Sequence, residues 1–361
     1  MRIGVNGYFL GLPNTGIETV LRGYLEQWAE TEHDLVIFCT KKPEQKLPEN
    51  LRVVVVAEPK LPNSLAKYYW ERKVLPKAIA KENCEVFWSP YPNVTRLKIP
   101  HLMTVHDIIP WVDRRYARWR TWFYYKCVAK NLAEVTKLHF VSESACVEFQ
   151  KFFPKIKTSQ IVVPNAINVP NSKDEFVGLQ KPYLFYLGGY DPRKNVALLI
   201  KTWAKYVGPK LGVDLVLGGK PPRENRLAYS PEKLIRDLPE GLRELVHLTG
   251  ALSETEKFSL YRHALGFVHL SESEGFNLPL LEAISVGCPA LVSDLLVHRE
   301  VGGGACLYIP LHEPEQLEDL FKKFVQEKDL RQKLKNKCKT QAALFSWKKS
   351  ADRLLQALIK I

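Results

Sequence analysis

The chain has 361 residues, of which 46% are hydrophobic and 25% are charged, a composition typical of a globular protein long enough for two domains. Its formal net charge of +13 favours an anionic partner, such as a phosphate group, a nucleic acid or a membrane surface. No apolar run approaches the ~20 residues that a membrane-spanning helix needs, so we expect a protein that is at most attached to a membrane face.

The first half of the sequence alternates apolar strands with helices. We expect strands at residues 3–9, 35–38, 53–57, 86–88, 102–105, 139–141 and 161–163. Helix-like stretches lie between several of them, at 16–30, 64–81, 116–135 and 143–152. This alternation predicts a mostly parallel sheet with both faces covered.

The second half restarts the same pattern. Strands are expected at 183–187, 215–217, 246–248, 266–270, 290–292 and 307–309. Residues 169–181 are polar and unpatterned, as is typical of a linker. We therefore predict an α/β protein with a first domain at 1–170 and a second at 171–340.

Ligand sites in parallel sheets lie at the carboxyl ends of the strands, so the turns that follow strands carry the candidate residues. Strand 183–187 runs into Gly188-Gly-Tyr-Asp-Pro-Arg193-Lys194. Its glycines allow a close approach of backbone to ligand, and its two cations suit an anion. The alternative is a solvated turn in which Asn195 starts the next helix.

Two turns of the first domain also hold candidates. Gly11-Leu-Pro-Asn-Thr-Gly16 precedes a helix and can close over an anion, but Ile17 stands where a Walker motif requires Lys, and the glycine spacing is not that of a dinucleotide-binding loop. His106 follows strand 102–105 and would face the ligand site. Its alternative is a core histidine satisfied by Asp107.

The stretch after strand 266–270 is the most informative. Pro279 fits the first turn of a helix, so we expect the backbone amides of 276–280 to be unpaired donors at a positive helix terminus, which suits a phosphate. Glu274 and Glu282 flank this anion site, and ionised carboxylates only accept hydrogen bonds, which indicates hydroxyl groups on the ligand. Phosphate with hydroxyls indicates a nucleotide sugar. For Glu282 alone, the alternative is that it complements the helix dipole or caps the first turn.

The segment Glu274-Gly-Phe-Asn-Leu-Pro-Leu-Leu-Glu282, with Gly287 and Pro289 behind it, resembles the Glu-x7-Glu motif of retaining glycosyltransferases of family 4 (group 1). Similar pieces span the chain: Thr15-Gly16, Val105-His-Asp107, Val141-Ser-Glu143, Pro164-Asn-Ala166, Leu187-Gly188, Pro192-Arg-Lys-Asn195, Leu248-Thr-Gly250, Arg299-Glu-Val-Gly302 and Phe345-Ser-Trp347. The resemblance implies the GT-B fold. In that fold two Rossmann-like, doubly wound domains face each other across a cleft, and a last helix, here at 341–361, packs back on the first domain.

The resemblance also implies roles for matching residues. Those expected at the donor diphosphate are Gly16, Arg193, Lys194, Phe276, Asn277 and Leu278. Glu282 would hold the nucleotide ribose, while Glu274 and His106 would contact the transferred sugar. Two positions depart from the family pattern: Gly189 follows Gly188 where the family often has Arg, and Asn277 replaces the usual glycine, so its side chain could touch the sugar and bias donor choice.

The implied reaction is a retaining transfer of a hexose from a nucleotide sugar, UDP-hexose first and GDP-mannose second, to a saccharide or lipid-linked acceptor of a cell-envelope polysaccharide. The chain has no Asp-x-Asp motif, so we expect Arg, Lys and helix amides to stabilise the diphosphate, with no metal or other cofactor. Closure of the domains should exclude water, with 220–226 as a candidate mobile loop. The alternatives are a basic protein that binds nucleic acid or an anionic surface without enzymatic activity, and a storage-glucan synthase on the same fold.

Residues 60–130 contain 14 Lys or Arg against 5 Asp or Glu. Within them lies a basic, aromatic segment that we expect at a membrane or acceptor surface: Arg114, Arg115, Arg118, Trp119, Arg120 and Trp122. On a helix it can rest on an anionic bilayer, with about 1 kcal/mol from each cation. Alternatively, Trp119, Trp122 and Phe123 pack on the first sheet and only the arginines meet solvent.

Seven scattered cysteines without a Cys-x-x-Cys pair favour a reducing compartment and argue against a structural zinc site. The first expected strand begins directly after Met1, which leaves no room for a signal peptide. We therefore expect a cytoplasmic protein, free or at the inner face of the cytoplasmic membrane.

Overall fold

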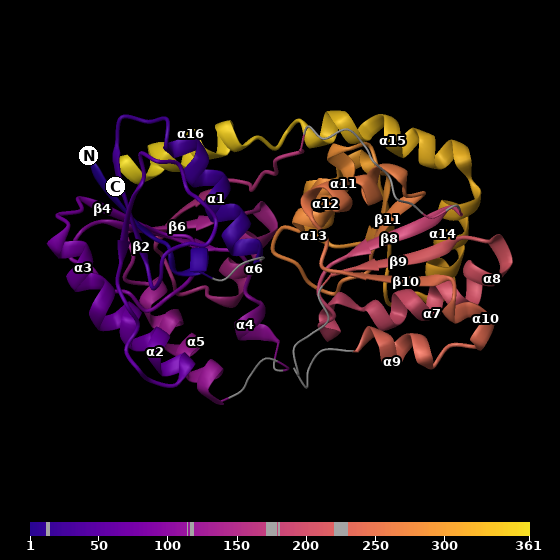
Figure 1. Cartoon of the computed structure of the whole chain (residues 1–361), viewed down its shortest axis with the longest axis horizontal. Coiled ribbons are helices and arrows are strands. Elements are labelled where there is room, and N and C mark those ends of the chain that lie inside the picture. Colours follow the sequence, from indigo (N-terminus) through magenta and orange to yellow (C-terminus); the bar gives the residue numbers. More distant parts are fainter. Residues whose placement is uncertain (12–14, 114, 116–118, 171–178, 180, 220–229) are drawn as a thin grey trace. The chain divides into compact units, whose positions relative to one another are not determined.

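The computed structural model describes residues 1–361 except 12–14, 114, 116–118, 171–178, 180 and 220–229 (Figure 1). The chain forms two compact units, Met1–Ala166 with Phe345–Ile361 (unit 1) and Ile167–Leu344 (unit 2). These boundaries lie close to the expected ones at 170/171 and 340/341. Most of the expected linker and the whole of the expected loop 220–226 lie outside the described residues.

Unit 1 is built on a seven-stranded parallel sheet in the order β3-β2-β1-β4-β5-β6-β7. The strands are β1 Arg2–Asn6, β2 Asp34–Cys39, β3 Arg52–Val55, β4 Val86–Ser89, β5 His101–Val105, β6 Lys137–Phe140 and β7 Ser159–Val162. The strands β4 and β5 are buried along their whole length, as expected for a sheet covered on both faces.

The first strand is shorter than its expected range of 3–9. Asn6 ends it because the Asn6 Oδ1 accepts a hydrogen bond from the Tyr8 amide at 3.1 Å, which turns the chain into the short helix η1, Tyr8–Gly11. The short helix η1 therefore follows directly at the carboxyl end of β1.

The helices of unit 1 are α1 Gly16–Trp28, α2 Asn63–Tyr69, α3 Leu75–Lys81, α4 Ile109–Val112, α5 Trp119–Leu132, α6 Glu143–Phe152 and α16 Trp347–Ile359. The single helix expected at 64–81 is wrong in detail, since a π-helical segment, η2 Trp70–Val74, separates α2 from α3. Pro76 explains the interruption, because it has no N–H to donate to the carbonyl one turn earlier.

The last helix completes unit 1, as the resemblance implied (Figure 1). The Trp28 Nε1 donates to the Ala351 backbone oxygen at 3.0 Å. Gly23 makes room for the ring of Trp347, since a Cβ at Gly23 would lie 2.3 Å from that ring. Helix α16 therefore packs directly on α1, and its removal would expose the core of unit 1.

Unit 2 is built on a six-stranded parallel sheet in the order β10-β9-β8-β11-β12-β13. The strands are β8 Tyr183–Leu187, β9 Asp214–Gly218, β10 Val246–Gly250, β11 Gly266–His269, β12 Ala290–Ser293 and β13 Cys306–Ile309. Its helical segments are η4 Pro192–Lys194, α7 Val196–Tyr206, α8 Gly208–Leu211, α9 Pro231–Arg236, α10 Glu240–Arg243, α11 Glu254–His263, α12 Leu278–Ser285, α13 Leu296–Gly302, η5 Gly303–Ala305, α14 Pro314–Gln326 and α15 Lys328–Ala342. Because β8 and β11 are neighbours, the turns that follow them meet at one edge.

Candidate active site

Three charged side chains meet at the carboxyl edge of β8 and β11. Lys194 Nζ lies 2.6 Å from Glu274 Oε1, and Arg193 Nη1 lies 3.2 Å from Glu274 Oε2. Arg193 Nη1 also donates to the Ser273 backbone oxygen at 2.9 Å. The Lys194 side chain is only 11% exposed. The alternative of a solvated turn after β8 is therefore wrong, and we call Arg193, Lys194 and Glu274 the charged triad.

The electrostatics of the charged triad keep its carboxylate ionised. Burial alone would raise the pKa of Glu274, but the charges of Lys194 and Arg193 outweigh it and lower this pKa far below the usual value. Two cations thus face one carboxylate, and the triad carries one surplus positive charge. An additional anion would satisfy that surplus.

Helix α12 begins beside the triad, with Pro279 in its first turn as predicted. Asn277 is the N-cap in the left-handed conformation, at φ 68° and ψ 68°. The Leu280 amide donates to Asn277 Oδ1 at 3.2 Å, so the expectation that the 280 amide is an unpaired donor is wrong. The roles of the backbone at Phe276, Asn277 and Leu278 remain predictions.

The side chain of Asn277 points into unit 2. It is buried, and its Nδ2 lies 2.7 Å from His269 Nδ1 and 2.9 Å from His298 Nε2. The expectation that this side chain touches the sugar is therefore wrong, because the two histidines and the helix cap use its polar atoms.

Glu282 lies on α12 but does not cap it. Its carboxylate contacts Lys257 Nζ at 2.7 Å and the Tyr261 hydroxyl at 3.1 Å, both on α11, so the capping alternative is wrong. Burial raises the pKa of Glu282, although the Lys257 charge opposes the rise. Sequence reasoning missed Lys257 and Tyr261. Their spacing of four residues, which puts them on one helix face, is the signal that could have found them.

Two predicted site residues lie in unit 1. His106 follows β5, and its Nε2 lies 2.7 Å from the Pro90 backbone oxygen. A carbonyl oxygen only accepts, so Nε2 carries the proton and Nδ1 is left to accept a hydrogen bond. Burial lowers the pKa of His106, which keeps it neutral. Gly16 opens α1, and a Cβ there would meet no described atom within 4 Å.

The basic, aromatic segment is described in part. Arg114 and Arg118 lie outside the described residues, and only the backbone of Trp119 and Arg120 is described, at the start of α5. Arg115 pairs with Asp113 at 2.8 Å.

Two aromatic residues further along α5 lie on the surface. Trp122 and Phe123 are 54% and 53% exposed. The alternative in which these two pack on the first sheet is therefore wrong.

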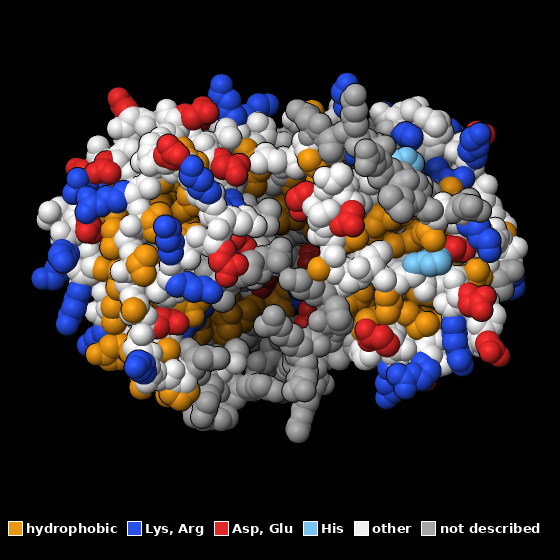
Figure 2. All heavy atoms as spheres, in the orientation of Figure 1, with side chains coloured by type: hydrophobic (Ala, Val, Ile, Leu, Met, Phe, Trp, Pro, Cys, Tyr) orange, Lys and Arg blue, Asp and Glu red, His pale blue; other side chains and the backbone are white. Residues whose placement is uncertain are grey.

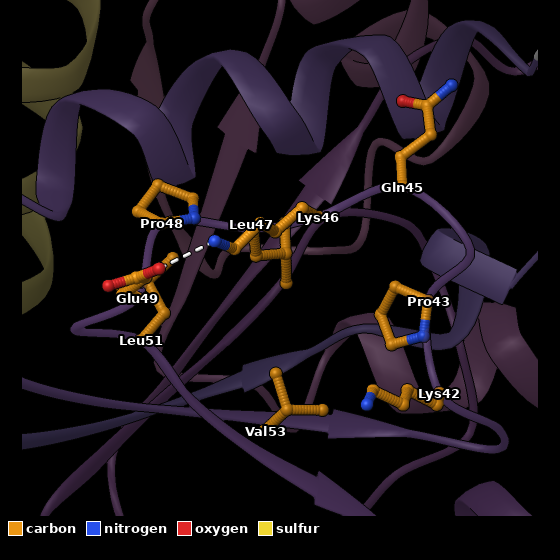
Figure 3. Close-up of a pocket in the computed structure, with 9 residues that line it drawn as sticks. All are labelled: Lys42, Pro43, Gln45, Lys46, Leu47, Pro48, Glu49, Leu51 and Val53. Atoms are coloured by element: carbon orange, nitrogen blue, oxygen red, sulfur yellow. Dashed lines mark hydrogen bonds and ion pairs between the residues drawn. The ribbon is translucent and has the colours of Figure 1, made fainter.

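One hollow of unit 1 has a volume of about 400 Å³ and is lined mostly by the loop that connects β2 to the edge strand β3 (Figure 3). Its lining is Lys42, Pro43, Gln45, Lys46, Leu47, Pro48, Glu49, Leu51 and Val53. Lys46 is already paired with Glu49 at 2.5 Å. None of the predicted site residues lines this hollow, so we do not place the chemistry there.

Comparison with known families and proteins gives consistent matches along the chain. The family model for Glycosyltransferase Family 4 matches residues 14–170, and that for Glycosyl transferases group 1 matches 170–341. The O-antigen chain mannosyltransferase B of Escherichia coli is 27% identical over 177 residues, which are 48% of this chain and 45% of that protein. The serotype-specific mannosyltransferase WbdA of Escherichia coli is 24% identical over 277 residues, 71% of this chain and 33% of that protein. The chain thus matches less than half the length of these two relatives.

Solved structures with the same fold cover nearly the whole chain. Sucrose-phosphate synthase from Thermosynechococcus elongatus superposes with a TM-score of 0.81 at 15% identity, covering 100% of this chain and 98% of that one. HepE of Anabaena in complex with UDP-glucose gives 0.76 at 14% identity, with full coverage of both chains. WaaG, a glycosyltransferase involved in lipopolysaccharide biosynthesis, gives 0.74 at 17% identity and 99% coverage of both. With its two parallel-sheet units, the chain has the expected GT-B fold.

Proposed function

The chain belongs to the group 1 glycosyltransferases of family 4, and on that premise we propose that it transfers a hexose from a nucleotide sugar to a saccharide or lipid-linked acceptor with retention of configuration. The charged triad at the start of α12 is the observation that carries this proposal. It offers two cations and a helix N-terminus to a diphosphate, and a carboxylate to the hydroxyls of a sugar.

In the proposed complex, Arg193 and Lys194 turn from Glu274 to the donor diphosphate. The backbone at the start of α12 meets the same phosphates. Glu282 accepts hydrogen bonds from the ribose hydroxyls while Lys257 holds its carboxylate in place. These contacts all come from unit 2, so we expect unit 2 to supply most of the affinity for the nucleotide.

The proposed reaction exchanges one bond of the sugar carbon for another. The bond from this carbon to the diphosphate oxygen breaks, the bond to the acceptor oxygen forms on the same face, and the acceptor proton passes to the leaving diphosphate. Arg193 and Lys194 stabilise the charge that develops on the leaving group, and Glu274 stabilises the positive charge on the sugar ring. His106 Nδ1 is an acceptor for a hydroxyl of the transferred sugar. No metal is required, so EDTA should leave the rate unchanged.

The identity of the sugar rests on the relatives. Two of them bear the name mannosyltransferase, which favours a mannose donor such as GDP-mannose. The complex of HepE with UDP-glucose keeps UDP-hexose as the competing donor. Glycogen as an acceptor tests the storage-glucan alternative, for which we expect no activity.

A thermal-shift panel with UDP, GDP, ADP and their hexose conjugates tests the proposed function. A ligand that binds only the native protein stabilises it by about 2.7 kcal/mol at a hundred times its Kd. We expect a clear rise in melting temperature with one nucleoside diphosphate and its sugar conjugates. No rise with any of them at millimolar concentration would contradict the proposal.

We further propose that unit 1 holds the protein on an anionic membrane, where a lipid-linked acceptor would lie. Helices α2 and α5 contact each other through the rings of Tyr68 and Phe123, whose centroids lie 6.5 Å apart. Both helices carry large exposed side chains, Leu65 and Tyr69 on α2 and Trp122 and Phe123 on α5, each near half exposure. Hydrophobic and basic side chains lie next to one another on this part of unit 1 (Figure 2). No helix among the described residues combines the length and apolarity needed to cross a membrane.

Sedimentation with vesicles tests the membrane contact. Wild type should bind vesicles that contain phosphatidylserine more strongly than neutral vesicles, and Trp122→Ser with Phe123→Ser should weaken this binding. Phe152→Ser is the matched control, because Phe152 is a 43% exposed aromatic of α6 in the same unit. Equal binding to neutral and anionic vesicles, or equal loss in the control, would contradict the contact.

A further inference from the structure

The Glu274 carboxylate has a third neighbour that the proposed function leaves unused. His269 is the last residue of β11, is fully buried, and places its Nε2 3.7 Å from Glu274 Oε1. This distance is too long for a hydrogen bond, and His269 Nε2 has no hydrogen-bond partner among the described residues. A buried polar nitrogen left in this way requires an explanation.

A chain of hydrogen bonds determines which nitrogen of His269 carries the proton. The Leu280 amide can only donate, so the Asn277 atom that faces it is Oδ1. The NH₂ group of Asn277 therefore faces both His269 Nδ1 and His298 Nε2, and because it only donates, both ring nitrogens must accept. The proton of a neutral His269 is then on Nε2.

His298 supports this orientation independently. Its Nδ1 lies 2.8 Å from the Ser293 backbone oxygen, which can only accept. The His298 proton is therefore on Nδ1, and its Nε2 is an acceptor for the Asn277 amide. The two ends of the network demand the same orientation of Asn277.

His269 is neutral in this environment. Burial and then the Lys194 charge lower the pKa of His269 well below its usual value, although Glu274 opposes them. The titratable groups that face it are Lys194, Glu274, His298, Arg193 and, through a ring contact, Tyr186. Since the proton is on Nε2, a neutral N–H donor points toward the carboxylate of the charged triad.

We propose that His269 is a positioning residue. Its Nε2–H donates a hydrogen bond to the Glu274 carboxylate when Arg193 and Lys194 turn to the donor diphosphate. This inference rests on the proposed function of the charged triad. A buried carboxylate that loses its cations is strongly destabilised unless another donor replaces them. A neutral donor meets this need without competing for the diphosphate, because it adds no charge. A shift of the carboxylate by less than ~1 Å would close the gap to hydrogen-bonding distance.

The same network gives Asn277 a role. A left-handed residue is usually glycine, which is also the residue that the family often has here. Asparagine tolerates this conformation, and its side chain joins the cap of α12 to the ring of His269. The side chain of Asn277 thus sets the tautomer of His269 rather than contacting the donor.

The tautomer can be measured on the wild-type protein with ¹⁵N-labelled histidine. We expect the NMR signals of His269 to show a protonated Nε2 and an unprotonated Nδ1 near neutral pH. Addition of the nucleoside diphosphate that binds, UDP or GDP, should shift the Nε2 proton downfield as the new hydrogen bond forms. A proton on Nδ1, on both nitrogens, or an Nε2 signal that the bound nucleotide leaves unchanged would overturn the proposal.

Two substitutions of His269 test whether the donor at Nε2 or the acceptor at Nδ1 supports nucleotide binding. In His269→Gln the side-chain amide reaches the position of Nε2 and keeps a donor there, whereas in His269→Asn it reaches only the position of Nδ1. We expect H269Q to bind UDP or GDP within about threefold of wild type. H269N should bind at least about tenfold more weakly, as for the loss of a hydrogen bond to a charged group. Binding of the free nucleoside, uridine or guanosine, should be equal in both variants.

The outcomes distinguish this inference from the proposed function. Binding of UDP or GDP to wild type, with equal affinity in H269Q and H269N, would overturn the role of His269 alone. No binding to wild type would overturn the function of the charged triad and this inference with it. Circular dichroism and melting curves show whether each variant is folded, and the NMR measurement decides the tautomer without any variant.

Discussion

Glu71 in unit 1 and Glu274 in unit 2 are both buried carboxylates, but their partners differ in kind. Glu71 is fully buried and accepts hydrogen bonds from the hydroxyls of Tyr91 at 2.9 Å and Tyr124 at 2.8 Å. Its cation, Lys67, is more distant, at 3.7 Å. The Lys67 Nζ also lies over the rings of four aromatic residues: Tyr8, Phe9, Tyr91 and Tyr124.

Glu274 instead has two close cations and one unused neutral donor. The pKa values follow the partners: burial raises the pKa of Glu71 despite Lys67, whereas the two cations lower that of Glu274 despite its burial. Fixed hydroxyl donors tie Glu71 into the core. The proposed function requires that the cations around Glu274 change partners when the anionic donor binds.

The largest expected effect is on the reaction itself. Glu274→Gln removes the negative charge but keeps the size of the side chain, so we expect transfer to fall by about 10²–10³-fold, the loss typical for removal of one transition-state contact. The melting temperature should fall as well, because the neutral amide leaves the buried charges of Lys194 and Arg193 without a counter-charge, so activity is measured at a temperature at which the variant is folded. A variant with wild-type turnover on the donor found in the thermal-shift panel would contradict the assignment.

The second effect is on stability and belongs to Glu71. Glu71→Ala leaves the hydroxyls of Tyr91 and Tyr124 without their acceptor, so we expect a loss of about 2–5 kcal/mol in the free energy of unfolding. Urea denaturation followed by tryptophan fluorescence measures it. Glu49→Ala is the control, since the exposed pair of Glu49 with Lys46 should contribute less than about 1 kcal/mol.

Nucleotide binding by the same variant, measured beside its urea denaturation, can contradict the contrast between the two glutamates. Nucleoside diphosphate affinity should be unchanged in folded Glu71→Ala. Loss of that affinity without loss of stability would mean that Glu71, rather than Glu274, belongs to the ligand site.

The smallest expected effect is a difference in pH dependence. A glutamate has a pKa of about 4.3 in the unfolded chain. The folded pKa of Glu274 is lower, so the unfolded state binds more protons and the stability that Glu274 contributes is lost as pH falls below about 4.3. The folded pKa of Glu71 is higher, so the folded state binds more protons and stability falls as pH rises above about 4.3.

Melting curves at closely spaced pH values measure both slopes. Glu274→Gln should flatten the dependence on the acid side of pH 4.3, and Glu71→Gln should flatten it on the alkaline side. The opposite assignment of the two slopes would contradict the partners described above.

The sequence predicted the order of strands and helices well, because alternating apolar runs and turn residues report on the backbone. All the expected strands are present, and Pro279 lies in the first turn of α12. Errors arose where a single residue overrides the pattern, as Asn6 does at the end of β1 and Pro76 does within the helix 64–81.

The site was predicted less completely. The residues after β8 and β11 could be brought together in advance, since the carboxyl ends of neighbouring parallel strands meet. The direction in which a side chain points could not be predicted from the sequence. Asn277, which was expected to touch the sugar, faces His269 and His298 in the structure. The spacing of Lys257 and Tyr261 places them on one helix face, but the packing that turns this face toward Glu282 could not be predicted from the sequence.

The most direct test of the central claim is calorimetric titration of UDP and GDP into wild type and Lys194→Met. We expect wild type to bind one of them and the variant to bind it at least about tenfold more weakly, because a charge-assisted contact to the diphosphate is lost. The matched nucleoside should bind both proteins equally. Equal affinity of the diphosphate for wild type and variant would contradict the claim that the charged triad receives the donor.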